Sequence, residues 1–139
     1  MARFCSPLDV RREDTGTWLL LSALSYDSDL LKPNPVIIPA RFRTDFASVP
    51  RLPGIYLLAG GRAHQAAVVH DYLYQTHDLS GISRRLADAV LFEAMGVCTP
   101  PEPEWMCWLF WSGVRVRGGR PWARSVRRRM ALNRTLKLR

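Results

Sequence analysis

The chain has 139 residues, the length of one ordinary domain that can bury a core of its own. Hydrophobic residues make up 47% of it and charged residues 23%, a balance that excludes a wholly disordered chain. The net charge of +8 is uneven, because residues 1–111 carry ten Lys/Arg and twelve Asp/Glu, whereas residues 112–139 carry ten Lys/Arg and no acid. We therefore predict a nearly neutral body with a strongly basic C-terminal segment that attracts anionic partners.

Targeting signals and cysteine motifs are missing from the sequence. No stretch approaches the roughly 18 uninterrupted apolar residues of a transmembrane segment, and the first residues contain no apolar run of signal-peptide length. We expect the chain to remain in the cytoplasm where it is made. Cys5, Cys98 and Cys107 form no Cys-x-x-Cys pair and have no histidine at zinc-finger spacing, so free thiols are expected.

The first 44 residues have the pattern of β-strands. Residues 17–26 are apolar between a glycine and an aspartate, which favours one buried strand. The prolines of residues 32–35 indicate a turn. Residues 36–38 are β-branched and predict a second strand, and residues 40–44 predict a further one. Together they predict a small antiparallel sheet.

Two helices are expected next. Apolar residues at three- and four-residue steps predict a helix from Arg62 to about Thr76, with His70 on its apolar face. Residues 75–82 are expected to form a polar connector, with His77 on its exposed side and Gly81 as the helix breaker.

The second helix is predicted from about Ser83 to Met95, with Ser83 as its N-cap. Its inward face is expected to contain Leu86, Ala89, Val90, Ala94 and Val97. Arg84 and Arg85 lie in the first turn, where a cation opposes the helix dipole. We therefore expect acids elsewhere, such as Asp78, to hold them.

The C-terminal third is aromatic and then basic. Residues 98–103 contain three prolines and predict a linker, after which residues 104–116 predict a helix that is apolar on all sides. Gly118 and Gly119 are expected to end this helix. Residues 120–139 place valine, methionine and leucine among arginines, a pattern compatible with an amphipathic helix.

These elements predict an α+β fold, in which a small N-terminal antiparallel sheet packs against two to three helices and a basic helical extension follows. Residues 1–104 are expected to form the core domain. Residues 105–139 are expected to form the aromatic helix and the basic extension.

A group of polar residues lies between the strands and the second helix. His70, Asp71, Asp45 and Asp88 are candidate catalytic residues if the two helices pack beneath the turn that follows residue 44. His70, Asp45 and Asp88 are candidate ligands of a divalent metal that activates water. Short polar side chains at Thr44 and Ser48 could support these ligands. The alternative interpretation is a buried polar network that fixes the fold.

The same region resembles domain-of-unknown-function family 1353, which is found mostly in bacteriophages and prophages. Three ordered motifs carry the resemblance: FRTDFASVPR at residues 42–51, HDYLY at residues 70–74, and SRRLAD at residues 83–88 followed by FEAM at residues 92–95. The resemblance implies a phage origin and a common fold. The basic segment beyond Trp122 lies outside it.

Two functional hypotheses follow. In the first, the chain is a phage virion or virion-assembly component, associated with the tail or neck, which docks to other phage structural proteins through its C-terminal segment. It would then move from the host cytoplasm into the virion. A homo-oligomer, nucleic acid bound without sequence specificity and an anionic surface are alternative partners. The residues expected to bind the partner are Trp105, Trp108, Trp111, Arg120, Arg124, Arg127, Arg128, Arg129, Arg134, Lys137 and Arg139.

In the second hypothesis, the chain is a metal-dependent hydrolase that cleaves peptide or amide bonds of the cell wall through the His/Asp group. The sequence contains no His-Glu-x-x-His motif, and only one histidine is well placed for a metal. The two hypotheses differ in what they require of His70 and Asp88. Catalysis requires them to line an accessible pocket, whereas a structural network requires them to be buried and paired.

Overall fold

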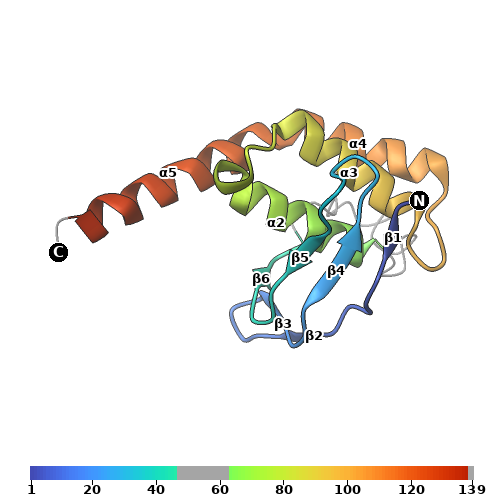
Figure 1. Cartoon of the computed structure of the whole chain (residues 1–139), viewed down its shortest axis with the longest axis horizontal. Helices are drawn as coiled ribbons and strands as arrows, with labels where there is room; N and C mark the ends of the chain where they lie inside the picture. The colour runs from blue at the N-terminus through green and yellow to red at the C-terminus, as the bar shows by residue number, and fades with distance from the viewer. Residues whose placement is uncertain (47–62, 138–139) are drawn as a thin grey trace.

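The computed structural model describes residues 1–46 and 63–137. It confirms the expected α+β class, with short antiparallel strands on one side of the molecule and helices on the other (Figure 1). The strands are β1 (Arg3–Phe4), β2 (Val10–Arg12), β3 (Trp18–Leu20), β4 (Leu24–Asp27), β5 (Val36–Ile38) and β6 (Arg43–Thr44). The helices are α2 (His64–Ser80), α3 (Arg84–Gly96), α4 (Glu104–Arg117) and α5 (Gly119–Lys137).

The described strands form two antiparallel sheets of three strands each, in the orders β1-β4-β5 and β2-β3-β6. The prediction of one strand over residues 17–26 was therefore wrong. The chain leaves the second sheet after Leu20 and enters the first at Leu24, and the three residues between them are exposed. An apolar run does not reveal such a change of partner strand, because Leu20 of the first half and Leu24 and Tyr26 of the second are buried in the same core.

Helix α2 is longer than predicted. It continues through the expected connector to Ser80 and ends where Gly81 adopts a left-handed conformation (φ 68°) and donates its backbone N–H to His77 O at 2.8 Å. The expected exposure of His77 was also wrong. The imidazole is buried because Trp122 of α5 stacks on it, with ring centroids 3.6 Å apart.

Helix α3 begins as predicted, with Ser83 Oγ accepting the backbone N–H of Leu86 at 3.2 Å. Its buried face is shifted from the predicted one. Leu86, Ala89 and Val97 are only partly buried, because α3 packs against α2 on one side and α4 on the other. The fully buried side chains are those of Ala87, Asp88, Val90, Leu91, Ala94 and Met95.

Helix α4 shares the hydrophobic core with the rest of the body. Met106, Cys107, Phe110 and Val114 are buried in it, whereas the opposite side of the helix is exposed. The exposed side also carries large apolar residues, such as Trp105 and Trp108, so the sequence of α4 appears apolar on all sides. The three cysteines are free, with Cys5 exposed and the other two buried.

Helix α4 ends at Arg117 with Gly118 as its C-cap, as the sequence suggested, and α5 begins at the next residue. Gly118 nevertheless keeps right-handed helical geometry. Its N–H donates to Val114 O at 2.7 Å, and its O accepts from Trp122 N at 3.1 Å, so α5 follows α4 after a single residue. The first turns of α5 lie on α2, and the remainder extends beyond the body (Figure 1).

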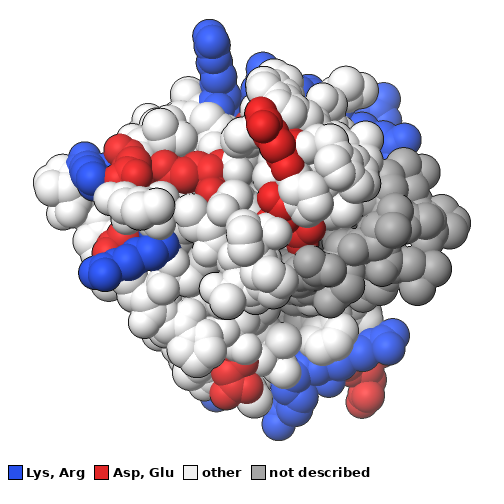
Figure 2. Space-filling view, turned by 90° about the vertical axis from the view of Figure 1, so that its right-hand side faces the viewer, with Lys and Arg blue, Asp and Glu red and all other residues white. Residues whose placement is uncertain are grey.

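The face at the end of the molecule opposite α5 differs from α5 in the charge of its side chains. Figure 2 shows acidic side chains in the middle of that face and also toward its left and lower edges, where basic side chains lie beside them. Helix α5, by contrast, contains basic residues and no acidic ones. No helix in the described part of the chain combines the length and the apolar character needed to cross a bilayer.

Candidate functional site

Asp88 lies where α2, α3 and α4 meet, and its side chain is fully buried. Its Oδ1 accepts the Tyr74 hydroxyl at 2.6 Å and His70 Nε2 at 2.8 Å. Its Oδ2 accepts Arg115 Nη1 at 2.9 Å. Both oxygens of the carboxylate therefore have protein donors, and the charge of Asp88 is balanced by an arginine.

The spacing of residues along each helix creates this arrangement. His70 and Tyr74 are four residues apart on α2, so they share a face, and their ring centroids lie 4.1 Å apart. Arg84 is one turn before Asp88 on α3, with its Nε 3.9 Å from Oδ2. Arg84 also donates to the Arg115 carbonyl oxygen at 2.8 Å, which fixes the end of α4. Arg84 is therefore held by Asp88 and by the end of α4, whereas the side chain of Asp78, the acid suggested by the sequence, lies outside the described part.

The pKa values in this group follow from burial and hydrogen bonding. Burial alone would raise the pKa of Asp88, but hydrogen bonds from His70, Tyr74 and Arg115 outweigh it, and the pKa lies below its usual value. Burial and the bond to Asp88 raise the pKa of Tyr74 well above its usual value. Asp88 is therefore ionised at neutral pH and Tyr74 is a hydrogen-bond donor.

A second polar contact joins β6 to α2. The Thr44 hydroxyl donates to Asp71 Oδ2 and accepts the backbone N–H of Phe46 at 3.1 Å. Thr44 is buried and Asp71 is partly buried. The Phe46 ring stacks on His64, and its backbone has a φ of 53°, so the chain turns sharply after β6.

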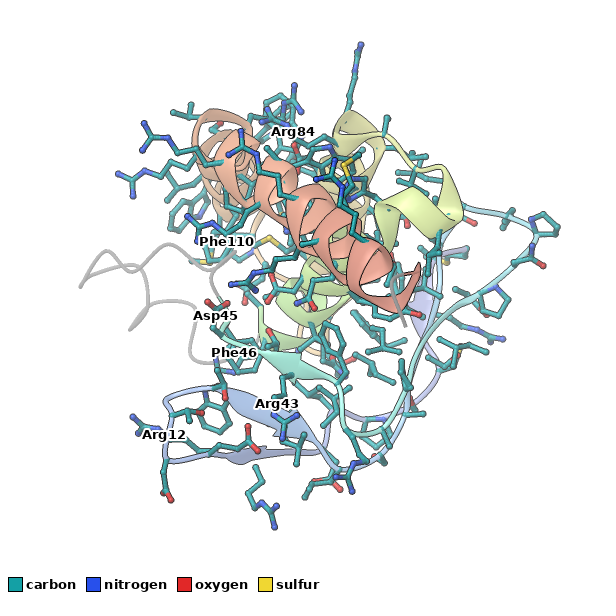
Figure 3. All side chains as sticks on the ribbon, turned by 90° about the vertical axis from the view of Figure 1, so that its left-hand side faces the viewer. Arg12, Arg43, Asp45, Phe46, Arg84 and Phe110 are labelled. Atoms are coloured by element: carbon teal, nitrogen blue, oxygen red, sulfur yellow. The ribbon has the colours of Figure 1, made fainter. Side chains whose placement is uncertain are left out.

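The other predicted residues of this region lie at the surface or outside the described part. Asp45 is exposed at the end of β6, and Figure 3 shows it well apart from Arg84, a neighbour of Asp88. Ser48 is outside the described residues. The structure thus joins His70 to Asp88 and Asp71 to Thr44, in two separate contacts.

A divalent metal does not fit the described residues. No group of three or more His, Cys, Asp or Glu side chains in residues 1–46 and 63–137 is arranged to hold a metal ion. His70 and Asp88 bond each other directly, and Arg115 adds a positive charge beside the carboxylate. This environment disfavours a further cation. The arrangement is suited to holding three helices together.

Two of the three side chains that donate hydrogen bonds to Asp88, those of Tyr74 and Arg115, were absent from the predicted site. Tyr74 had a detectable signal, since it lies one turn after His70 on the same helix face. Arg115 had none, because it is 27 residues from Asp88 and belongs to a helix that the sequence predicts only as aromatic and basic. The contact between Arg115 and Asp88 becomes visible only in the packed structure, where α4 lies against α3.

The predicted partner-binding residues lie along α4 and α5. Trp105 and Trp108 are about half exposed, and Trp111 is partly buried against Trp108. Trp122 anchors α5 to α2 through Tyr74 and His77. The arginines with described exposed side chains are Arg120, Arg124, Arg127, Arg128 and Arg134, whereas the side chains of Arg129, Lys137 and Arg139 lie outside the described part.

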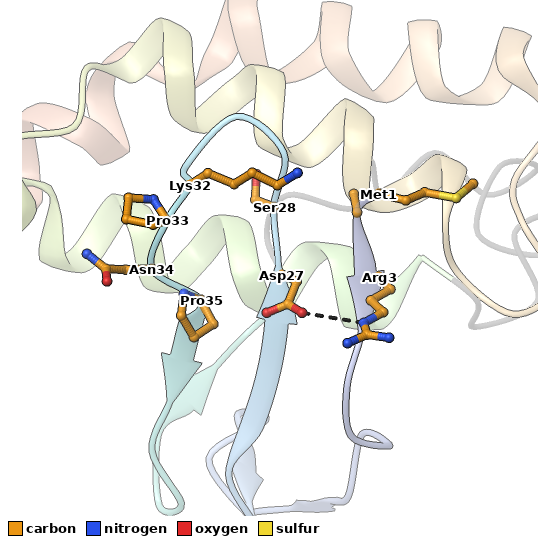
Figure 4. A pocket seen from close by; sticks show the side chains of 9 residues that line it. Met1, Arg3, Asp27, Ser28, Lys32, Pro33, Asn34 and Pro35 are labelled. Carbon is orange, nitrogen blue, oxygen red and sulfur yellow. Dashed lines mark hydrogen bonds and ion pairs between the residues drawn. The ribbon is translucent and has the colours of Figure 1, made fainter.

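A hollow of about 660 Å³ lies elsewhere, between the start of β1, the end of β4 and the turn before β5 (Figure 4). Its charged groups are paired at the surface. Arg3 bonds Asp27 at 3.4 Å, and Lys32 bonds Asp29 at 2.6 Å. The hollow contains neither His70 nor Asp88, so the Asp88 group does not open into it.

Comparison with known proteins gives one match. A family model with the description "Protein of unknown function (DUF1353)" matches residues 18–114. This range runs from β3 to near the end of α4 and leaves α5 outside. No curated protein and no solved structure matches the chain.

Proposed function

Because the chain belongs to the DUF1353 family, whose description specifies no activity, we propose its function from its own surfaces, as an attachment component of a phage particle or of its assembly machinery. It docks to an acidic surface of another phage structural protein through α5. The phage setting rests on the resemblance of the three motifs described above. The chain would meet its partner in the host cytoplasm and enter the virion with it.

The observation that carries this proposal is the placement of α5. Its first turns are fixed to the body by Trp122, which stacks on His77, and by Ser125 Oγ, which lies 3.5 Å from His77 Nδ1. The rest of the helix extends away from the body, and basic side chains point outward around it (Figures 1 and 3). A fixed, projecting cationic helix is suited to binding an anionic partner.

The buried Asp88 group supports this choice over hydrolysis. A general acid or base must reach its substrate, whereas Asp88 is fully buried and both of its oxygens accept protein donors. The described residues thus support a structural role for His70 and Asp88, and no described contact favours the cell-wall hydrolase.

The test is incorporation of altered chains into phage particles and assembly intermediates, measured by immunoblot. Deletion of residues 127–139 leaves Trp122 and Ser125 in place, so the body should fold, as circular dichroism can verify. We expect this deletion to lower incorporation at least tenfold, because it removes the projecting arginines. A full-length chain with Arg124, Arg127, Arg128 and Arg134 replaced by glutamine should behave in the same way.

A matched control removes the same charge from the body. Arg11, Arg12, Arg41 and Arg85 are exposed, and their replacement by glutamine should leave incorporation unchanged. Equal loss in the control would show that net charge, not α5, governs attachment. Undiminished incorporation of the deletion, or absence of the intact chain from both particles and intermediates, would refute the proposal.

A further inference from the structure

One side of α4 and one side of α5 are exposed. The residues on these two sides follow one another at steps of three or four, so they form one row. We call this row the outer stripe, and every member is exposed. It consists of Trp105, Leu109, Ser112, Val116, Arg120, Ala123, Arg127, Met130 and Arg134.

The outer stripe passes from α4 to α5 across Gly118. This residue has right-handed helical geometry and is hydrogen-bonded to Val114 and to Trp122. The buried and partly buried residues Phe110, Val114 and Trp122 follow one another across it at multiples of four. The opposite side of α4 is buried through Phe110 and Val114, and Trp122 of α5 faces α2. The row is therefore the side of the helix that the body leaves uncovered.

The composition of the outer stripe is apolar and cationic. Trp105 is 57% exposed, Val116 84% and Met130 62%, and Trp108 adds a second half-exposed indole beside the row. The three charged members are arginines, and the chain has no Asp or Glu after Glu104. Apolar side chains of this size are rarely left exposed in one patch unless they contact a partner.

We propose that the outer stripe binds the surface of an anionic lipid bilayer, with α4 and α5 lying in the plane of the membrane. A bilayer has negative headgroups above an apolar layer, which matches arginines and apolar side chains in one row. Indole rings favour this interface because they are apolar with one polar N–H. This inference does not rest on the attachment role.

The shape of the surface favours a bilayer over a protein groove. Helices α4 and α5 follow one another along the outside of the molecule (Figure 1), an arrangement that suits contact with a broad surface. The hollow between β1, β4 and the turn before β5 contains no member of this row. Contact is interfacial, since no described helix is suited to crossing a membrane.

The test is co-flotation of the full chain with vesicles of phosphatidylcholine, with and without phosphatidylglycerol. The intact chain should bind the mixed vesicles, bind pure phosphatidylcholine at least tenfold more weakly, and dissociate as salt is raised. Replacing Trp105 and Leu109 by glutamine should weaken binding about tenfold or more. Replacing Arg120, Arg127 and Arg134 by glutamine should weaken it roughly 100-fold at low salt.

The matched control replaces exposed apolar residues on the sheet side. Leu30 and Ile37 are 48% and 57% exposed, and their replacement by glutamine should leave vesicle binding unchanged. Circular dichroism should show the same helix content in all variants. Failure of the intact chain to bind the mixed vesicles, or equal losses in stripe and control variants, would overturn the inference. Vesicles contain no phage protein, so this result is independent of particle incorporation.

Discussion

Asp88 is the residue on which most of the helix packing converges. Removing its side chain takes a hydrogen-bond acceptor from buried His70 and from Arg115, whose side chain is 32% exposed. A hydrogen bond lost in the interior costs more than one lost at the surface. Both the catalytic and the structural interpretation assign a role to the Asp88 carboxylate. Its contribution to stability can be measured.

We expect Asp88→Ala to lower the free energy of unfolding by about 3–5 kcal/mol, measured by chemical denaturation. Tyr74→Phe removes one hydrogen-bond donor to Asp88 and keeps the ring, so we expect it to lower the free energy of unfolding by about 1–2 kcal/mol. Asp9 is exposed, and Asp9→Ala should change stability by less than about 0.5 kcal/mol. A cost for Asp88→Ala as small as that of the control would mean that the network does not hold the helices together.

The lowered pKa of Asp88 makes stability depend on acid. Because the folded-state pKa lies below the unfolded value of about 3.9, the ionised group contributes its full stabilisation above that value. The contribution is lost as the pH falls through the folded pKa. The stability difference between wild type and Asp88→Asn should thus be constant from pH 5 to 7 and shrink below about pH 4. Denaturation curves across this range test it, and an unchanging difference would contradict it.

At the scale of elements, Gly118 allows α4 and α5 to pass close to α2. A Cβ at this position would lie 2.5 Å from the Tyr74 hydroxyl oxygen, which itself donates to Asp88. A side chain would have to displace either Tyr74 or α5. The glycine is therefore required by packing, although its backbone conformation is an ordinary helical one.

We expect Gly118→Ala to cost about 1–3 kcal/mol of unfolding free energy, the usual effect of overpacking. The Cβ would also lie close to the backbone oxygen of Val114. In a Tyr74→Phe background the cost should be smaller, because one of these two close atoms is absent. Gly96→Ala is the control, since no atom lies within 4 Å of a Cβ there. Equal costs of Gly118→Ala in both backgrounds would show that Tyr74 is not the obstacle.

Helix types and order could be predicted from the sequence, whereas several boundaries could not. The apolar repeat predicts α2 and α3, and Ser83 identifies the start of α3. The end of α2 was misplaced because His77 is polar in sequence and is buried only when Trp122 covers it. Gly118 was correctly placed at the end of α4, but the sequence did not show that its small size is also needed beside Tyr74.

At the scale of the whole molecule, the sequence predicts the α+β class and the uneven charge, but not the division into two sheets. That division depends on which edge each short strand joins, as in the pairing of Leu24 with Ile38 and of Leu20 with Val10. Of the residues grouped from the sequence, His70 and Asp88 lie within hydrogen-bonding distance across two helices. Asp45 did not join them, since the turn after β6 leaves it exposed.

The single-residue junction between α4 and α5 has a mechanical consequence for any contact made at the C-terminal end. A disordered tether leaves the tethered body free to rotate, whereas a helix transmits direction as well as position. Arg115 ties this helix to Asp88, and Trp122 ties it to α2. Whatever holds the far end of α5 therefore also sets the angle at which the two sheets face their surroundings.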